Sequence, residues 1–574
     1  MASTCGGGIH VEQRRHPPAM PTAEREYLLE PLAAAVDARA QRLDRRGFSA
    51  RLYSGDPELW GADPTARELV AARLGWLELP GAMRAVRWPS RHAGDVLLIG
   101  IGGSSLAARA CSMAFGTDAL RVIDSTVPEA VIGVVDATEL AGAAVIVASK
   151  SGTTLETEVL AEWFLRTAAH QGAAVELVAI TDAGTVLQER VEAMGGRVWC
   201  NRPDVGGRFS ALSYFGLVPA ALAGVPVATL VDRAVAAESR RTSSSDPSVR
   251  LGIILAEAFN VGRDKITFVT APRLTGFADW AEQLIAESTG KQGTGLVPVT
   301  REPPLDGALY GSDRLFVVVD DESENDDRTC LIGEKLVAAG HPVIRHTLSD
   351  PADLGAEFLR WEVAVATAGA LMGINPFDEP DVAAAKARTH RMLEDVQEGS
   401  HLPDPVAAFE DEHASFYLSG EQRHGFGPDS DALGAWLTQR CGEASEGYCA
   451  LLAFLPVGEH IAALLDETRA LVTERFGVAT TLGWGPRYLH STGQLHKGGP
   501  PNGVYILLTA DDAEDLDIPG RGYTLGTVAG AQALGDMEAL RERQRPVMRI
   551  HLHAPITESF EIVVDSLRRG ADVR

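Results

Sequence analysis

Residues 147–158, VASKSGTTLETE, join a short apolar run to a polar stretch that has the pattern of a helix start. The polar stretch gathers small hydroxyl and basic side chains around Gly152, and these are Ser149, Lys150, Ser151, Thr153 and Thr154. A helix N-terminus offers unpaired N–H groups and partial positive charge, so such side chains can complete a seat for an anion such as phosphate. Ordinary capping of the helix by Ser and Thr is the alternative.

Two glycine-rich turns have the character of ligand-binding loops. GIGGSS, residues 100–105, follows an apolar run, and its glycines let the backbone approach a ligand closely. A dinucleotide-binding fold is an alternative for this turn, although it lacks the full GxGxxG spacing and a clear acidic partner. VGGRFSALS, residues 205–213, carries Arg208 after two glycines, and a guanidinium suits an oxyanion. A surface arginine after a turn is the alternative there.

The stretch TGFADWAEQLIAESTGK, residues 275–291, predicts a helix that could carry a base. Its apolar side chains recur at helical spacing, at Phe277, Trp280, Ala281, Leu284 and Ile285. Glu287 falls on the flank of this stripe. Partial desolvation raises the pKa of a carboxyl group and makes it a better base, whereas a solvated glutamate at a helix end would have no such role.

The elements that must position these residues have the rhythm of an α/β protein. From about residue 95, short apolar runs that end in Gly, Ser, Thr or Asp alternate with helical stretches, which predicts parallel sheets flanked by helices. The expected parts are an N-terminal helical segment at 1–90, α/β units at 91–245 and 251–395, an irregular acidic linker at 396–432, and a C-terminal α/β unit at 433–574.

Composition restricts the function classes. The 574 residues are 45% hydrophobic and 23% charged, which is typical of a globular protein with sizeable cores. The net charge of −26 argues against binding to nucleic acid or to anionic membranes. Six scattered cysteines without metal-like spacing favour free thiols. No apolar run suits a signal peptide or a bilayer span, so we expect a cytoplasmic protein. With no cluster of metal-ligand residues in the sequence, we also expect neither a metal nor a cofactor.

The motifs together resemble those of glucose-6-phosphate isomerases. The stretches around 100–105, 149–157, 205–213 and 283–291 occur in the order and approximate spacing of that family, and NPFDEPDVAAAK at 375–386 resembles the C-terminal signature of its bacterial members. The resemblance covers about residues 90–395 and implies two sugar-isomerase domains in tandem.

The remaining sequence is similar to the isomerase half of bifunctional transaldolase/glucose-6-phosphate isomerase proteins. LHSTGQLHKGGPPNG at 489–503 and RLGWLELP at 73–80 carry this likeness. No sequence that resembles a transaldolase barrel precedes them, so we expect no transaldolase activity.

The resemblance implies roles for particular residues. Ser149, Ser151 and Thr154 match positions that hold the sugar phosphate, and Lys150 and Thr153 belong to the same loop. Gly103 and Ser104 match the glycine turn near the sugar. Arg208 matches an arginine that stabilises the enediolate, Glu287 the base that moves a proton between carbons 1 and 2, and Lys386 a lysine near the ring oxygen.

One position departs from the family pattern. The ring-opening histidine of the family lies between the base and the final lysine, but here HSTGQ lies beyond Lys386. His490 is therefore the best candidate for this acid, with His496 and Lys497 as close rivals.

The expected reaction is the reversible isomerisation of glucose 6-phosphate to fructose 6-phosphate in glycolysis and gluconeogenesis. The expected partners are a phosphosugar substrate and a second copy of the chain in a homodimer. A noncatalytic sugar-phosphate sensor and an isomerase of another phosphosugar are the alternatives. Glu287 separates enzyme from sensor, because a sensor needs the phosphate loop but not the base.

Overall fold

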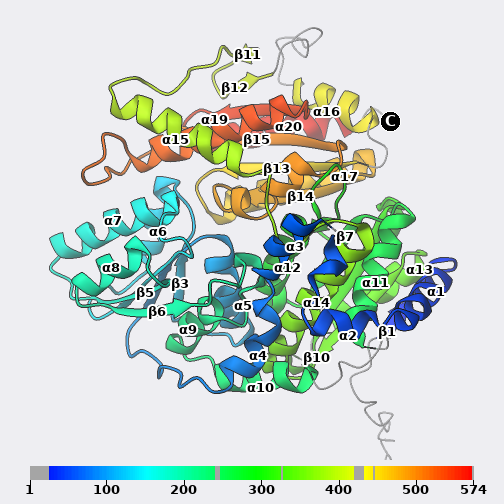
Figure 1. The fold of residues 1–574 in the computed structure, drawn as a ribbon. Helices are drawn as coiled ribbons and strands as arrows, with labels where there is room; N and C mark the ends of the chain where they lie inside the picture. Colours follow the sequence, from blue (N-terminus) through cyan, green and yellow to red (C-terminus); the bar gives the residue numbers. More distant parts are fainter. Residues whose placement is uncertain are drawn as a thin grey trace, which may run out of the picture.

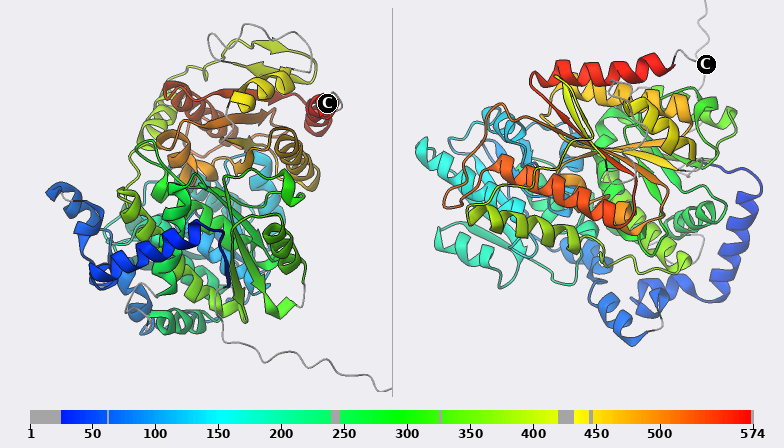
Figure 2. Two further views of the ribbon diagram at one scale, coloured as in Figure 1. Left: turned by 90° about the vertical axis from the view of Figure 1, so that its right-hand side faces the viewer. Right: turned by 90° about the horizontal axis from the view of Figure 1, so that it is seen from above.

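The computed structural model describes residues 25–61, 63–238, 246–324, 327–418, 432–443 and 447–571. Within these ranges the chain forms three α/β units, each built on a mainly parallel sheet with flanking helices (Figure 1). The C-terminal unit lies across the other two, and the views turned by 90° agree that it packs against them (Figure 2). The α/β class with parallel sheets flanked by helices is confirmed.

The first sheet has five parallel strands in the order β3-β2-β4-β5-β6. They are β2 (Val96–Ile99), β3 (Leu120–Ile123), β4 (Ala144–Ala148), β5 (Glu176–Asp182) and β6 (Arg197–Asn201). The central strands β2 and β4 are uninterrupted apolar runs, because helices bury both faces. Helices α6 (Pro128–Asp136), α7 (Leu155–His170) and α8 (Val186–Ala193) cover one face, and α5 (Leu106–Ala114) and α9 (Tyr214–Leu222) the other.

The second sheet has the strand order β1-β10-β9-β7-β8. Its parallel strands are β7 (Lys265–Thr270), β8 (Val297–Val299), β9 (Arg314–Asp321) and β10 (Val343–Leu348). The helices around it are α10 (Val227–Glu238), α11 (Pro247–Asn260), α12 (Thr275–Thr289), α13 (Arg328–Ala338) and α14 (Leu354–Met372).

The N-terminal segment is not helical throughout, which differs from the sequence expectation. Its first described element is β1 (Arg25–Tyr27), an antiparallel edge strand that pairs with β10 and satisfies the outer backbone groups of that strand. The helices that follow are α1 (Leu32–Arg45), α2 (Phe48–Tyr53), α3 (Pro64–Ala71) and α4 (Leu79–Met83).

The third sheet has six strands in the order β11-β12-β16-β15-β13-β14. They are β11 (Phe409–Glu410), β12 (Ala414–Tyr417), β13 (Tyr448–Phe454), β14 (Ala479–Trp484), β15 (Gly503–Ala510) and β16 (Val547–Leu552). Helices α16 (Ala432–Glu443), α17 (Glu459–Phe476) and α20 (Ile556–Ala571) bury one face. The other face packs with α19 (Leu525–Glu542) into a core that continues into the first unit.

The parallel strands of all three sheets are wound in the same order. In each set, the first parallel strand is β2, β7 or β13, the second pairs on one side of it, and the third pairs on its other side. The turning points lie between β2 and β4, between β7 and β9, and between β13 and β15. Open parallel sheets bind ligands at the carboxyl ends of strands beside such points, so each unit has a place for a ligand.

Two segments near the expected boundary at 395 belong to the third unit. Helix α15 (Ala383–Gln397), which the sequence analysis assigns to the second unit, packs on α19. Gly535 permits this close approach, because a Cβ there would lie 3.0 Å from the Thr389 hydroxyl. The linker expected to be irregular contains β11 and β12, which extend the sheet: β12 pairs antiparallel with β16, and β11 pairs antiparallel with β12. Strands this short carry too little periodicity to be recognised in sequence.

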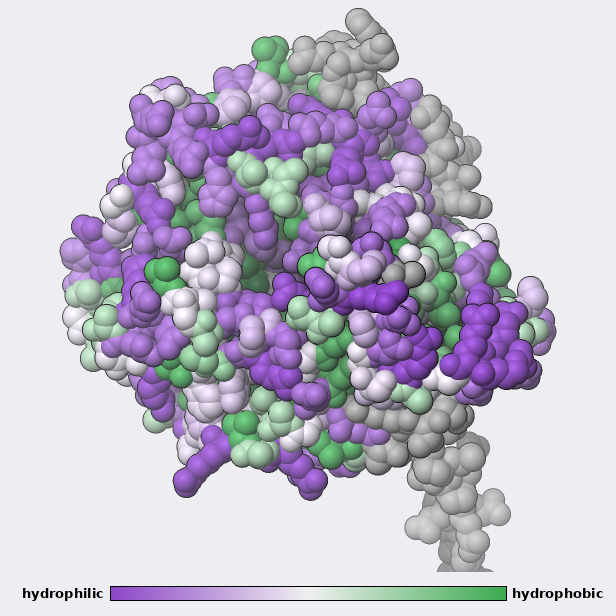
Figure 3. All heavy atoms as spheres, in the orientation of Figure 1, coloured by the Kyte–Doolittle hydropathy of each residue, from purple (hydrophilic) through white to green (hydrophobic). Residues whose placement is uncertain are grey.

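The surface and the thiols agree with the composition. Figure 3 shows hydrophilic side chains over much of the visible face, with apolar ones scattered between them. The cysteines in the described ranges are all free thiols, as the sequence predicts. No helix in these ranges is long and apolar enough to cross a bilayer.

A buried carboxyl group on α14 gives a test of the core. Glu362 is fully buried, and a backbone hydrogen bond from Ala211 offsets only part of the cost of that burial. Burial raises the pKa of Glu362 well above its usual range. The folded chain then holds this proton more tightly than the unfolded chain, so its stability falls as pH rises above the unfolded-state pKa of about 4.3.

We expect Glu362→Gln to remove this loss, because glutamine does not titrate. The melting temperature of the variant relative to the parent should rise between pH 5 and pH 8, measured by calorimetry at each pH. Glu189→Gln, at an exposed position on α8, is the matched control and should show no such trend. A constant difference for Glu362→Gln across this range would contradict a raised pKa.

Candidate active site

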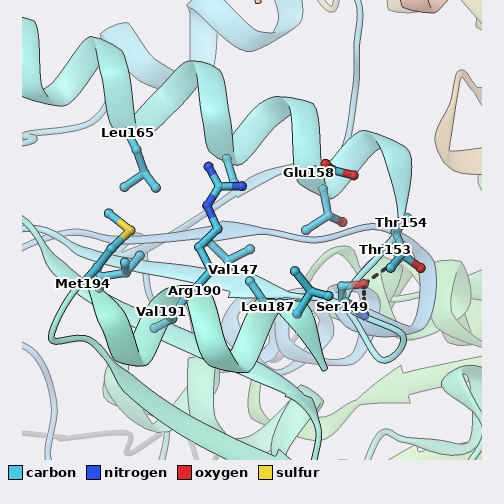
Figure 4. A pocket seen from close by; sticks show the side chains of 15 residues that line it. Val147, Ser149, Thr153, Thr154, Glu158, Leu165, Leu187, Arg190, Val191 and Met194 are labelled. Atoms are coloured by element: carbon cyan, nitrogen blue, oxygen red, sulfur yellow. Dashed lines mark hydrogen bonds between the residues drawn. The ribbon is translucent and has the colours of Figure 1, made fainter. Parts of the chain in front are cut away.

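The hydroxyl-rich loop between β4 and α7 is tied together by its own side chains. The Ser149 hydroxyl lies 3.0 Å from that of Thr154 and accepts a hydrogen bond from the Gly152 amide at 3.1 Å (Figure 4). The Ser151 hydroxyl accepts from the amide and the hydroxyl of Thr153, each at 3.2 Å. Gly152 has φ +70°, which explains the glycine at the centre of the turn. The loop therefore presents several hydroxyls at the start of a 16-residue helix.

Lys150 points away from these hydroxyls. Its ammonium group lies 2.5 Å from an Asp182 carboxylate oxygen and donates to the Pro203 carbonyl at 3.0 Å. Lys150 thus connects the loop to Asp182, the last residue of β5, and to Pro203. Sequence position alone could not show the direction of this side chain.

The two glycine turns lie against each other. Gly103 and Ser104 belong to the short 3-10 turn η3 (Gly102–Ser104), and Arg208 to η4 (Gly207–Phe209). A Cβ at Gly103 would lie 2.2 Å from the Gly207 carbonyl oxygen, so only glycine fits. The Ser210 hydroxyl also donates to the Gly103 carbonyl at 3.1 Å. This close approach brings the turn after β2 next to the turn that carries Arg208.

Arg208 is a buried cation held by two separate segments, α12 and the loop after α14. Its Nε donates to the Ser288 hydroxyl at 2.9 Å, and its Nη2 donates to the carbonyls of Pro376 and Asp378 at 2.7 and 2.9 Å. The residue is only 4% exposed, so these fixed partners replace water. The guanidinium therefore has one orientation, with Nη1 directed toward the carboxylates described next.

Glu287 faces the guanidinium of Arg208. Its Oε1 lies 3.1 Å from Nη1 of Arg208, and the same nitrogen lies 3.1 Å from Oε2 of Glu379. Burial raises the pKa of Glu287, Arg208 opposes this shift, and the negative charge of Glu379 adds to it. For Glu379, burial is outweighed by Arg208, which lowers its pKa. The site thus holds a buried candidate base beside a fixed positive charge.

A cavity of about 230 Å³ lies where the first unit meets α15 and the third unit. Its polar lining combines the phosphate loop with side chains from the C-terminal part of the chain, and includes Thr154, Glu156, Lys386, His490, Lys497 and Gln532. A second cavity of about 110 Å³, between α7 and α8, shares Thr153 and Thr154 with it (Figure 4). The lining of that second cavity is mainly apolar and contains none of the predicted acid–base residues.

His490 enters the larger cavity from the 3-10 turn η10 (Arg487–His490) and pairs with a buried carboxylate. Its Nε2 lies 2.8 Å from Oε1 of Glu156, and that oxygen also accepts from Gln532 Nε2 at 2.7 Å. Burial alone would raise the pKa of Glu156, but the interactions with His490 outweigh it and hold the pKa at about 2. Glu156 is therefore ionised and orients the imidazole.

Gln283 on α12 connects the two halves of the site. Its amide nitrogen donates to Oε2 of Glu287 at 3.1 Å and to the backbone carbonyl of His490 at 2.7 Å. Glu287 and Arg208 do not line the larger cavity, but this bridge fixes them relative to the histidine that does.

His496 and Lys497, the other candidates for the ring-opening acid, have different surroundings. His496 is buried among the rings of Tyr448, Tyr488 and Tyr505, and burial lowers its pKa well below the usual range. A neutral histidine enclosed in this way does not reach the cavity. Lys497 lines the cavity, but its ammonium pairs with the fully buried Asp536.

Lys386 reaches the same cavity from α15. The positive charge of Lys386 helps to lower the pKa of Glu156. Lys386 and His490 are therefore the two sequence-predicted acids that the structure brings together.

Sequence reasoning missed Glu156, Gln283, Glu379 and Gln532. Glu156 lies within residues 147–158, but a carboxylate in the first turn of a helix is normally explained by the helix dipole. Glutamines carry no chemical signal of their own, and nothing in the sequence places Glu379 beside Arg208 and Glu287. Their roles follow from contacts across the chain.

The fold defines a tandem α/β protein of the sugar-isomerase type, in which the Glu156–His490 pair lies beside a hydroxyl-rich loop. A crystal structure of a hypothetical protein from Thermus thermophilus has a similar fold, with a TM-score of 0.53 and 25% sequence identity. The match covers 65% of this chain and 100% of that chain.

Sequence comparisons identify the family. The family model for phosphoglucose isomerase matches residues 81–294, which include Gly103, Arg208 and Glu287 but not His490. The glucose-6-phosphate isomerase of Rubrobacter xylanophilus is 30% identical over 404 residues, which are 58% of this chain and 94% of the relative. That of Symbiobacterium thermophilum is 27% identical over 390 residues, which are 56% of this chain and 87% of the relative. The chain belongs to the glucose-6-phosphate isomerase family.

Because one chain supplies both halves of the site, variants of the two halves should not rescue each other. We expect Glu287→Gln and His490→Gln each to lose most isomerase activity, and a mixture that has been unfolded and refolded together to show only the sum of the two residual activities. A coupled assay measures this, with parent protein refolded in the same way as the control. Recovery toward one quarter or one half of the parent activity would show that His490 serves a neighbouring chain.

Proposed function

We propose that the protein catalyses the reversible isomerisation of glucose 6-phosphate to fructose 6-phosphate through an enediolate. The observation that carries this proposal is the buried pair of Glu287 and Arg208, whose Oε1 and Nη1 atoms lie 3.1 Å apart. A base beside a fixed cation suits removal of a proton next to a carbonyl, because negative charge then develops on oxygen.

The phosphate group of the substrate would bind at the loop between β4 and α7. Ser149, Ser151, Thr153 and Thr154 present hydroxyls there, and the helix start adds N–H groups. Lys150 supports this loop through Asp182 and does not contact the phosphate in the proposed arrangement.

Ring opening requires an acid that protonates the ring oxygen, and His490 fills this role. The Glu156 carboxylate holds its Nε2, so Nδ1 is the nitrogen that would act on the sugar. This arrangement resembles other sites in which a carboxylate fixes the orientation of a catalytic imidazole. Lys386, in the same cavity, would lie near the ring oxygen and assist.

Proton transfer follows on the open sugar. Glu287 takes the proton from carbon 2, Arg208 stabilises the enediolate, and the protonated Glu287 returns the proton to carbon 1. The turn with Gly103 and Ser104 would lie along the sugar, since it contacts the Arg208 segment directly. No electrons are exchanged with a cofactor in this sequence of steps.

A purely regulatory sugar-phosphate sensor would need only the phosphate loop. Removal of the Glu287 and Glu156 carboxyl groups from most contact with water is costly without a chemical role, which favours the enzyme. The homodimer and the cytoplasmic location remain predictions from the sequence. The choice of glucose 6-phosphate as the preferred substrate rests on the family assignment.

Replacing the base tests the mechanism directly. Glu287→Gln keeps the shape of the side chain but cannot accept a proton, so we expect kcat to fall by about 10²–10⁴-fold or more. KM should change little, because the phosphate loop is unaltered. Exchange of the carbon-2 hydrogen with solvent deuterium, followed by NMR, should be lost in parallel.

Glu282 on the same helix provides the matched control. It is buried as well, and burial raises its pKa to about 7, but its carboxylate contacts Thr300 at 3.3 Å and not Arg208. Glu282→Gln should therefore keep kcat within a few-fold of the parent. If Glu287→Gln isomerises and exchanges like the parent, another residue is the base.

Glu379 offers a test of how the base is tuned. Its negative charge raises the pKa of Glu287, so Glu379→Gln should lower that pKa. The base would then stay ionised at lower pH, and the acidic limb of the kcat/KM profile should move to lower pH. Glu398→Gln, at an exposed position, is the control. A limb that stays in place, or moves to higher pH, would contradict the tuning by Glu379.

A further inference from the structure

A cluster of two histidines and one aspartate lies at the carboxyl edge of the third sheet. His551 is on β16 and His553 directly follows that strand, while Asp511 directly follows the neighbouring β15. Alternation along the strand directs His551 to the face opposite the core residues Ile550 and Leu552. No motif in the sequence indicates this cluster, because only strand pairing brings Asp511 to the histidines.

The two ring nitrogens of each histidine contact different kinds of group. Nε2 of His551 lies 3.1 Å from Oδ1 of Asp511, and Nδ1 of His553 lies 3.7 Å from Oδ2. The other nitrogen of each ring contacts a hydroxyl at 3.0 Å, that of Thr509 for His551 and that of Ser415 for His553. One nitrogen from each ring therefore faces the same carboxylate.

This arrangement differs from an ordinary surface ion pair. Histidine ligands of metals commonly have their second ring nitrogen held by an outer partner, which fixes the ring and its tautomer. The three ligand groups lie within 4.8 Å of one another. A tetrahedral ion with bonds of about 2.0–2.2 Å separates its ligands by about 3.4 Å, and the two observed separations lie on either side of this value.

We propose that Asp511, His551 and His553 bind a divalent transition-metal ion of the zinc type. Two imidazoles and one carboxylate are a donor set that zinc prefers, whereas magnesium and calcium prefer oxygen ligands throughout. The carboxylate is already fixed, because its Oδ2 accepts the Ala554 amide at 3.2 Å. Three protein ligands leave a coordination position for water or a second ligand.

One of the three residues, His551, also lines a cleft of about 300 Å³. His551 and Thr509 belong to its lining, as does Arg549, which is 9% exposed and whose Nε has no hydrogen-bond partner among the described residues. Strand alternation places Arg549 and His551 on the same face of β16. The cleft lies beside the β13–β15 turning point and shares no lining residue with the larger active-site cavity.

The test measures metal binding by the purified full-length chain after removal of metal with a chelator. Titration with zinc against a chromophoric indicator, and with cobalt(II) followed by its visible absorption, should reveal a site in the parent. His551→Ala, His553→Ala and Asp511→Asn should each weaken binding at that site by about 100-fold or more. Thr509→Val, which removes an outer partner, should weaken it by about 10–100-fold.

The chain has 15 histidines, so a matched control is needed. His460→Ala removes an exposed histidine on α17 and should bind zinc like the parent. Zinc should raise the melting temperature of the parent and of His460→Ala but not of the ligand variants. Each variant is first checked for a parent-like melting curve in chelator. Equal zinc affinity and equal cobalt spectra in parent and ligand variants would overturn the proposal.

Discussion

The burial of one guanidinium group organises the active site. Arg208 is taken out of water, so each of its donors must meet a partner within the protein. Ser288 comes from α12, and the Pro376 and Asp378 carbonyls come from the loop after α14, so one cation joins the first unit to two parts of the second. Glu287 is held at its position by the same requirement. The loop after α14 also leads directly into α15, which carries Lys386 to the cavity.

The third unit completes the site that the first two units leave open. It contributes His490 from the turn after β14 and Gln532 from α19, both of which meet Glu156 of the first unit. Arg469 on α17 fixes the third unit to the second, since its buried guanidinium donates to the carbonyls of Thr300 and Arg301. The relative position of the units is thus set by buried polar contacts as well as by a continuous apolar core.

The pKa values of two carboxyl groups in the site are shifted in opposite directions. Both Glu156 and Glu287 are buried, which favours the neutral form. Interactions with His490 more than offset this for Glu156, whereas Arg208 offsets it only in part for Glu287 because Glu379 competes for the same cation. An ionised carboxylate that orients an imidazole and a carboxyl that can exchange a proton are then available in one site.

The sequence by itself determined the α/β class and the positions of the glycine-rich and hydroxyl-rich turns, because these depend on short-range patterns. Strand-length apolar runs, glycines at positive φ and hydroxyls at a helix start are all encoded within about ten residues, and the stretch around Ser149 and the helix with Glu287 carry such patterns. The family motifs also indicated Arg208 and Lys386. The motifs could not indicate the orientation of a side chain. Lys150 is an example, because its ammonium group contacts Asp182 and not the loop hydroxyls.

Only the tertiary structure decided which distant residues meet. Glu156 and His490 are separated by more than half of the chain, and their pairing depends on how the third unit docks. His490 and His496 likewise differ only in their three-dimensional surroundings, since one lines a cavity and the other is enclosed by tyrosine rings. Burial, orientation and pairing arise from the packing of whole units, and no local pattern in the sequence records them.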